Sequence, residues 1–108
     1  MNQIDRLLEI VATYKKHGWA VSGALLTDET RKLLEDTGYN ELKGVKAADI
    51  DAVWFFRPSH QQREAWELRL IAETPYALFE TFAADFPEPE REATRKEMEG
   101  RLQEYVSR

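Results

Sequence analysis

The segment WFFRPSHQQREAWELRL, residues 54–70, concentrates side chains that could do chemistry. It holds two of the three tryptophans, three arginines, two glutamates and one of the two histidines. Side chains of these types can bind a metal ion, move a proton or contact a partner. Their spacing along the chain is what separates these possibilities.

The spacing argues against a metal site and against nucleophilic catalysis. The chain has no cysteine, and its only histidines, His17 and His60, are far apart without a partner at metal-ligand spacing. Ser59 adjoins His60, but sequence neighbours are seldom oriented for proton transfer, and no nucleophile elbow surrounds the serine. The five glycines are scattered, so they build no phosphate-binding loop. We therefore predict no metal, no cofactor and no catalytic residue.

A period of two in the apolar residues predicts a β-hairpin. The alternation covers residues 50–57 and 64–72, and the polar stretch PSHQQR between them has the composition of a turn. If Phe56 pairs with Trp66, the partners along the hairpin include Trp54 with Leu68 and Ala52 with Leu70. This register collects the large apolar side chains on one face, which we interpret as a wall of the core.

The opposite face of the predicted hairpin is the candidate for function. A ladder of cross-strand ion pairs would explain its charged residues without any function. Phe55 is either covered by a second layer of structure or partly exposed, and an exposed aromatic residue between arginines has the composition of an interface hot spot. The candidate interaction surface, turn included, consists of Phe55, Arg57, His60, Glu67 and Arg69.

Helices are predicted at the start of the chain and at its end. Ile4, Leu7, Leu8 and Val11 have helical spacing within residues 2–17. The segment after Pro89 is also predicted to be a helix, and its thin apolar stripe suggests a helix laid over the surface or one that meets a partner.

The segments between these helices and the hairpin are less uniform. A strand is expected near Trp19, with Gly23 marking a bulge or a close approach of two backbones. A short helix follows Thr27 and ends at Gly38. Residues 39–48 are expected to be a connection. Residues 74–85 fit a strand or a helix, and the helical interpretation is favoured because Thr74-Pro75 resembles a helix start.

Together these elements predict one α+β domain spanning residues 1–108. The expected architecture is a small antiparallel sheet of about three strands, including the 50–57/64–72 hairpin, packed with about four helices in a two-layer sandwich.

Composition and charge limit the partners. The net charge is −5 and the basic residues are interspersed with acidic ones, which disfavours nucleic acid and anionic membranes as ligands. No apolar stretch reaches the ~20 residues that a membrane helix needs, and residues 1–6 do not resemble a signal peptide. We expect an acidic, soluble, cytoplasmic protein.

Two hypotheses of function remain. The first is a non-enzymatic module for protein–protein interaction, which binds another protein or a second copy of itself as a homodimer. The alternative is a small-ligand-binding domain or enzyme with a pocket between sheet and helices, using Glu67, Arg69 and His60 or Tyr76. A cavity of ~300 Å³ or more in which these groups converge would favour the alternative.

Overall fold

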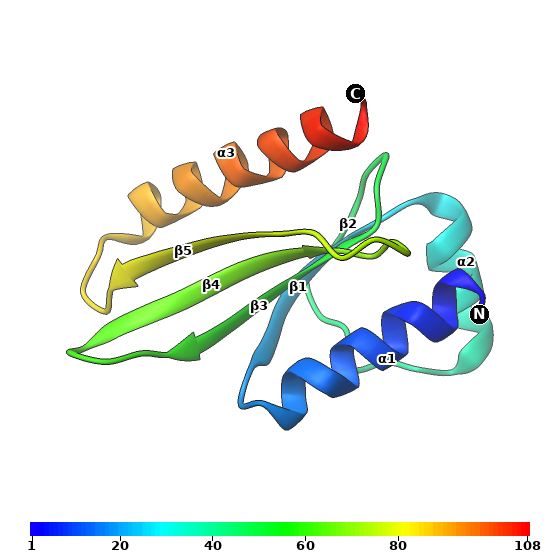
Figure 1. The fold of residues 1–108 in the computed structure, drawn as a ribbon, viewed down its shortest axis with the longest axis horizontal. Coiled ribbons are helices and arrows are strands. Elements are labelled where there is room, and N and C mark those ends of the chain that lie inside the picture. The colour runs from blue at the N-terminus through cyan, green and yellow to red at the C-terminus, as the bar shows by residue number, and fades with distance from the viewer.

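The computed structural model describes all of residues 1–108 and contains three helices and five strands. The helices are α1 (Gln3–Lys16), α2 (Asp28–Thr37) and α3 (Glu88–Val106). The strands are β1 (Ala20–Leu26), β2 (Val45–Ala47), β3 (Ala52–Pro58), β4 (Arg63–Leu70) and β5 (Ala77–Ala83). Helices α1 and α2 lie on one side of the sheet and α3 lies on the other (Figure 1).

The predicted fold class is wrong in its counts and its layers. The sheet has five strands in the order β2-β1-β3-β4-β5, and it is mixed because β1 and β2 run parallel. Three helices, not about four, cover it from both sides, so the domain has three layers and not two. The extra strands are β2, whose three residues are all exposed, and β5, which had been predicted as a helix.

Local sequence signals explain where the helices begin and end. The Asn2 side chain accepts a hydrogen bond from the Asp5 amide at 2.8 Å and caps α1. The Thr27 hydroxyl caps α2 in the same way through the Thr30 amide. Gly38, with φ of 74°, ends α2 in the left-handed conformation that glycine adopts at low cost. Pro89 lies in the first turn of α3, as predicted from its missing amide hydrogen.

The predicted hairpin register is confirmed. Strand β3 pairs antiparallel with β4, and Ala52, Trp54 and Phe56 lie opposite Leu70, Leu68 and Trp66 in that order. Strand β1 joins β3 with a bulge between Val21 and Gly23, as the glycine indicated. A Cβ atom on Gly23 would lie 3.3 Å from the Gly44 carbonyl oxygen, so the close approach of β1 to the β2 segment depends on this glycine.

The two faces of the sheet bury separate apolar clusters. Toward α1 and α2, one cluster includes Leu7, Leu26, Val53 and Phe55. Toward α3, the other includes Trp54 and Leu68 of the predicted core wall. Helix α3 contributes Met98 and Leu102 to this second cluster. The sheet is thus a shared middle layer between two cores.

Strand β5 forms one edge of the sheet. The Leu70 amide donates to the Tyr76 carbonyl and the Ala84 amide to the Gln62 carbonyl, so even-numbered residues of β5 bond to β4. The backbone groups of Phe79 and Thr81 therefore point away from the sheet. At Thr81 both groups are capped, because Glu80 accepts from its amide and Arg63 donates to its carbonyl.

Candidate functional site

The two faces of β3 and β4 determine where the predicted site residues lie. Arg57, Glu67 and Arg69 occupy the sheet face toward α1, and Phe55 lies directly opposite Glu67 in the register. His60 lies in the turn between β3 and β4, where it is exposed. Three of the five predicted residues are thus grouped on an accessible face, and His60 is separate from them at the tip of the hairpin.

Phe55 is covered by a second layer of structure and is not partly exposed, which were the two arrangements that its sequence pattern allowed. Its exposed fraction is 0%, and the Tyr14 ring stacks on it with centroids 4.0 Å apart. Tyr14 belongs to the last turns of α1, so this helix supplies the second layer that the alternation of the hairpin could not specify. A partner cannot contact Phe55 in this structure, and its contribution is to the core.

Tyr14 also connects the helix to the charged residues of β4. Its hydroxyl donates a hydrogen bond to the Glu67 carboxylate, and the Arg69 guanidinium lies 6.0 Å from the centre of its ring. Burial raises the pKa of the Tyr14 hydroxyl above its ordinary value of 10.0, and the hydrogen bond to Glu67 raises the pKa further. The phenol therefore stays protonated at neutral pH and serves as a donor.

Arg57 is held by the residues that follow α1. Its guanidinium lies 4.5 Å from the centre of the Trp19 ring, and it donates to the His17 carbonyl at 3.3 Å. A groove of about 240 Å³ runs beside these residues and is lined by Thr13, Tyr14, His17, Trp19 and Glu67. The end of α1 therefore forms one wall of a shallow recess next to the hairpin arginines.

Phe79 extends this surface, and the sequence analysis missed it. It lies opposite Glu67 on β5, and 57% of it is exposed. In the predicted helix it belonged to the apolar stripe, whereas in β5 it shares the face of Glu67 and Arg69. Strand alternation would have placed it there.

Apart from the Tyr14 side chain of α1, which reaches Glu67, no helix lies over β4 and β5 on this side. Helix α1 packs against β1, whereas α3 packs against β4 and β5 from the opposite side (Figure 1). We call the uncovered residues the open face. They are Arg57, Arg63, Glu67, Arg69, Phe79 and Thr81.

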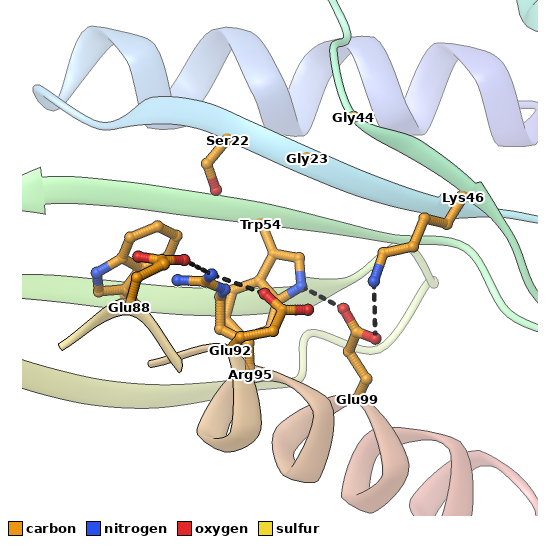
Figure 2. A pocket seen from close by; sticks show the side chains of 10 residues that line it. Ser22, Gly23, Gly44, Lys46, Trp54, Glu88, Glu92, Arg95 and Glu99 are labelled. Carbon is orange, nitrogen blue, oxygen red and sulfur yellow. Dashed lines mark hydrogen bonds and ion pairs between the residues drawn. The ribbon is translucent and has the colours of Figure 1, made fainter. Parts of the chain in front are cut away.

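A cavity lies on the other side of the sheet, between β1, β2 and α3. Its volume is about 330 Å³, and Trp54 and Trp66 are its only hydrophobic lining residues among ten (Figure 2). Glu99 accepts from the Trp54 indole at 2.8 Å and lies 3.5 Å from the Lys46 ammonium. This cavity has the volume that the ligand-binding alternative requires, but Glu67, Arg69, His60 and Tyr76 do not line it.

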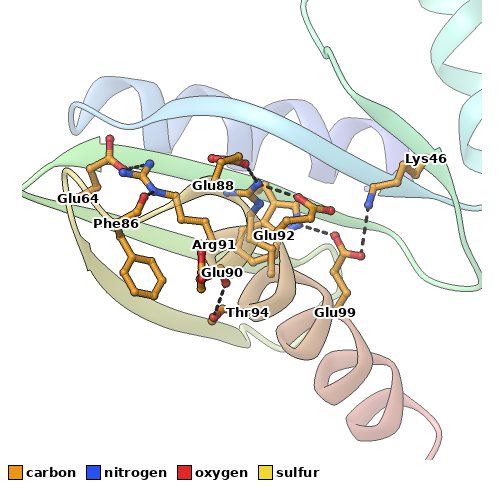
Figure 3. Close-up of polar contacts among 11 residues, drawn as sticks. Lys46, Glu64, Phe86, Glu88, Glu90, Arg91, Glu92, Thr94 and Glu99 are labelled. Atoms are coloured by element: carbon orange, nitrogen blue, oxygen red, sulfur yellow. Dashed lines mark hydrogen bonds and ion pairs between the residues drawn. The ribbon is translucent and has the colours of Figure 1, made fainter.

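The charged groups around this cavity neutralise one another. Arg95 pairs with Glu88 and with Glu92, which lies 2.7 Å away. The hydrogen bond from Arg95 lowers the pKa of the Glu92 carboxyl, so this acid is ionised and cannot serve as a proton donor at neutral pH. Arg91 pairs with Glu64 at 2.6 Å and donates to the Phe86 carbonyl, which ties the start of α3 to the sheet (Figure 3). The arrangement is that of a helix held on a sheet by polar contacts.

Two further findings concern the whole chain. The structure contains no cluster of three or more histidine or acidic residues placed to hold a metal ion. None of its helices combines the length and the apolar character that crossing a membrane requires.

Comparisons with protein-family models, with curated proteins and with solved structures give no match for this chain.

Proposed function

We propose that this chain is a protein-binding domain without catalytic activity, and that its partner docks on the open face. The observation that carries the proposal is the half-covered sheet. On one side, α1 and α2 cover the β1 end, while β4 and β5 expose Phe79 and a group of arginines. A single exposed apolar residue is ordinary on a protein surface, so the binding role is argued from Phe79 together with the arginines and the uncovered strands around it.

The composition of the open face and its border supports this role. Tyrosine, tryptophan and arginine dominate the residues that carry most of the binding energy in protein interfaces. The open face and its border contain residues of all three types, namely Tyr14, Trp19, Arg57 and Arg69. The Arg57 guanidinium contacts the Trp19 ring, and the Arg69 guanidinium contacts the Tyr14 ring. A surface whose side chains are already ordered loses less conformational entropy when it binds.

The cavity beneath α3 offers less support for the ligand-binding alternative. Small-molecule sites are mostly apolar, with a few polar groups that remain free to bind the ligand. Eight of the ten residues that line this cavity are not hydrophobic, and its charged side chains are engaged with one another.

A site-specific photo-crosslinker tests the proposal in the cells that make this protein. A crosslinking phenylalanine analogue is placed at Phe79, and in a control protein it replaces Leu33 on α2, which is also apolar and is 42% exposed. We expect a discrete adduct from position 79 and none from position 33. Mass spectrometry of the adduct identifies another protein or a second copy of this chain.

Two results would contradict the proposal. One is the absence of any adduct at position 79, and the other is the same set of adducts at both positions. In a Phe79→Ser variant, crosslinking from other positions of the open face should be lost. If this variant melts at the same temperature as the parent, that loss is not caused by unfolding.

A further inference from the structure

The arginines of the open face have no acidic partner within the protein. Arg57 donates to the His17 carbonyl, Arg63 to the Thr81 carbonyl and hydroxyl, and Arg69 to the Leu70 carbonyl. None of the three takes part in the seven ion pairs of the structure. Their positive charges are therefore left without a carboxylate.

The charge of the open face is opposite in sign to that of the whole chain, which has 20 acidic and 15 basic residues. On the opposite side of the sheet, Arg91 and Arg95 both pair with glutamates. On the open face the only acid is Glu67, and its carboxylate accepts from Tyr14. Three arginines and one glutamate give the face a formal charge of +2 on a protein whose net charge is −5.

The geometry suits carboxylates. A guanidinium group beside an aromatic ring is restrained in orientation, and its N–H groups at the edge can bind a carboxylate through two parallel hydrogen bonds. Arg57 has this arrangement with Trp19, and Arg69 lies near Tyr14. Phe79, in the next strand, offers an apolar contact between the charged positions.

We propose that the partner presents an acidic segment, with aspartate or glutamate side chains bound by Arg57, Arg63 and Arg69 and an apolar side chain packed on Phe79. This inference rests on the proposed function and specifies its partner. A nucleic acid fits less well, because a continuous chain of phosphates would meet Glu67 in the middle of the face. An acidic peptide can place its few charges at the arginines alone.

The test is a selection of peptides from a random display library against the purified protein. We expect the enriched peptides to be acidic and to contain an apolar residue. Their affinity should fall about tenfold or more in an Arg57→Gln, Arg63→Gln, Arg69→Gln variant, since each lost contact is a charge-assisted hydrogen bond. It should also fall as salt rises from about 50 to about 300 mM.

A matched control separates local contacts from net charge. The control variant loses three positive charges at exposed residues of α2 and α3 that form no ion pair. Its changes are Lys32→Gln, Lys96→Gln and Arg101→Gln. This variant should keep the parent affinity. If Arg69→Gln lowers the melting temperature, the double change at Arg57 and Arg63, both exposed, provides the same comparison in a folded protein.

The outcomes distinguish this inference from the proposed function. If Phe79→Ser abolishes binding and the arginine variant binds normally, docking on the open face stands and the acidic partner is overturned. If neither change affects binding, both proposals fail. Enrichment of neutral or basic peptides, failure to enrich any peptide, or tighter binding of a single-stranded oligothymidylate than of the selected peptides would each overturn the acidic partner.

Discussion

Tyr14 is the residue at which the core and the open face meet. One side of its ring contacts Phe55, which is fully buried, and its hydroxyl reaches the Glu67 carboxylate on β4. The same side chain thus contributes to packing between helix and sheet and fixes the position of an acid among the arginines.

The raised pKa of Tyr14 leads to a prediction about stability at high pH. Because the folded state holds this proton more tightly than the unfolded state, the stabilisation is complete below the ordinary pKa of 10.0 and is lost as the pH rises above it. We expect Tyr14→Phe to reduce the fall in unfolding free energy between neutral pH and high pH. Urea denaturation of both proteins across this range measures the difference.

Other groups that titrate in this range, such as Tyr39, are present in both proteins and cancel in the comparison. If the unfolding free energy of Tyr14→Phe has the same pH dependence as that of the parent, burial and Glu67 do not raise the pKa of the Tyr14 hydroxyl.

The hairpin shows what residue patterns can and cannot predict. Alternation was enough to assign Phe55, Glu67 and Arg69 to one face and Trp54 and Leu68 to the other, because a strand turns successive side chains to opposite sides. Whether a residue on a face is covered depends on the path of another element. Phe55 and Arg69 share a face, yet only Phe55 lies beneath α1.

At the scale of elements, α3 is attached to the sheet by few apolar residues. Only Met98 and Leu102 are buried along its 19 residues, as the thin stripe in the sequence indicated. The Tyr105 ring of this helix also stacks on Tyr76, and polar contacts add to these, among them the hydrogen bond between Glu99 and the Trp54 indole. Trp54 is 4% exposed, so this indole has little access to water.

Glu99 variants should separate hydrogen bonding from charge. Glu99→Leu leaves the buried indole N–H of Trp54 without an acceptor, which we expect to lower the unfolding free energy by ~1–3 kcal/mol. Glu99→Gln keeps an acceptor and should have a smaller effect. Urea denaturation of both variants measures the contrast, and equal losses would show that the charge of Glu99 matters and its hydrogen bond does not.

Strand β5 was predicted as a helix, and its place at the edge explains the error. A strand over these residues places Glu80 on the same face as Leu78 and Phe82. In a central strand this would bury a charge, but at an edge the side chain reaches solvent, and Glu80 is exposed. Strand β2 was not predicted, because three exposed residues are too short a run for alternation to be recognised.

At the scale of the whole molecule, the sheet separates two cores that touch different helices. Ile4 packs in the cluster beneath α1, and Met98 packs in the cluster beneath α3. The backbone of the sheet separates the side chains of the two clusters. Losses of unfolding free energy caused by substitutions in different clusters should therefore add.

A double-mutant cycle tests this independence. We expect Ile4→Val to cost ~0.5–1.5 kcal/mol and Met98→Ala ~2–5 kcal/mol. The coupling between them should be within ~0.5 kcal/mol. Met98→Ala combined with Ile50→Val, which lies in the same cluster as Met98, is the matched comparison and should show larger coupling. Similar coupling in both pairs would argue against two independent cores.

The capped edge of β5 limits how copies of this protein can associate. An open edge strand can act as a template on which further chains add without end, because each new strand offers another unpaired edge. Here the Thr81 amide and carbonyl are already bonded to Glu80 and Arg63, which leaves Phe79 and Ala77 as the outward backbone groups at the other end of the strand. Capping at Thr81 interrupts the row of unpaired outward backbone groups, which makes this edge a poorer template for a further strand than an uncapped edge would be.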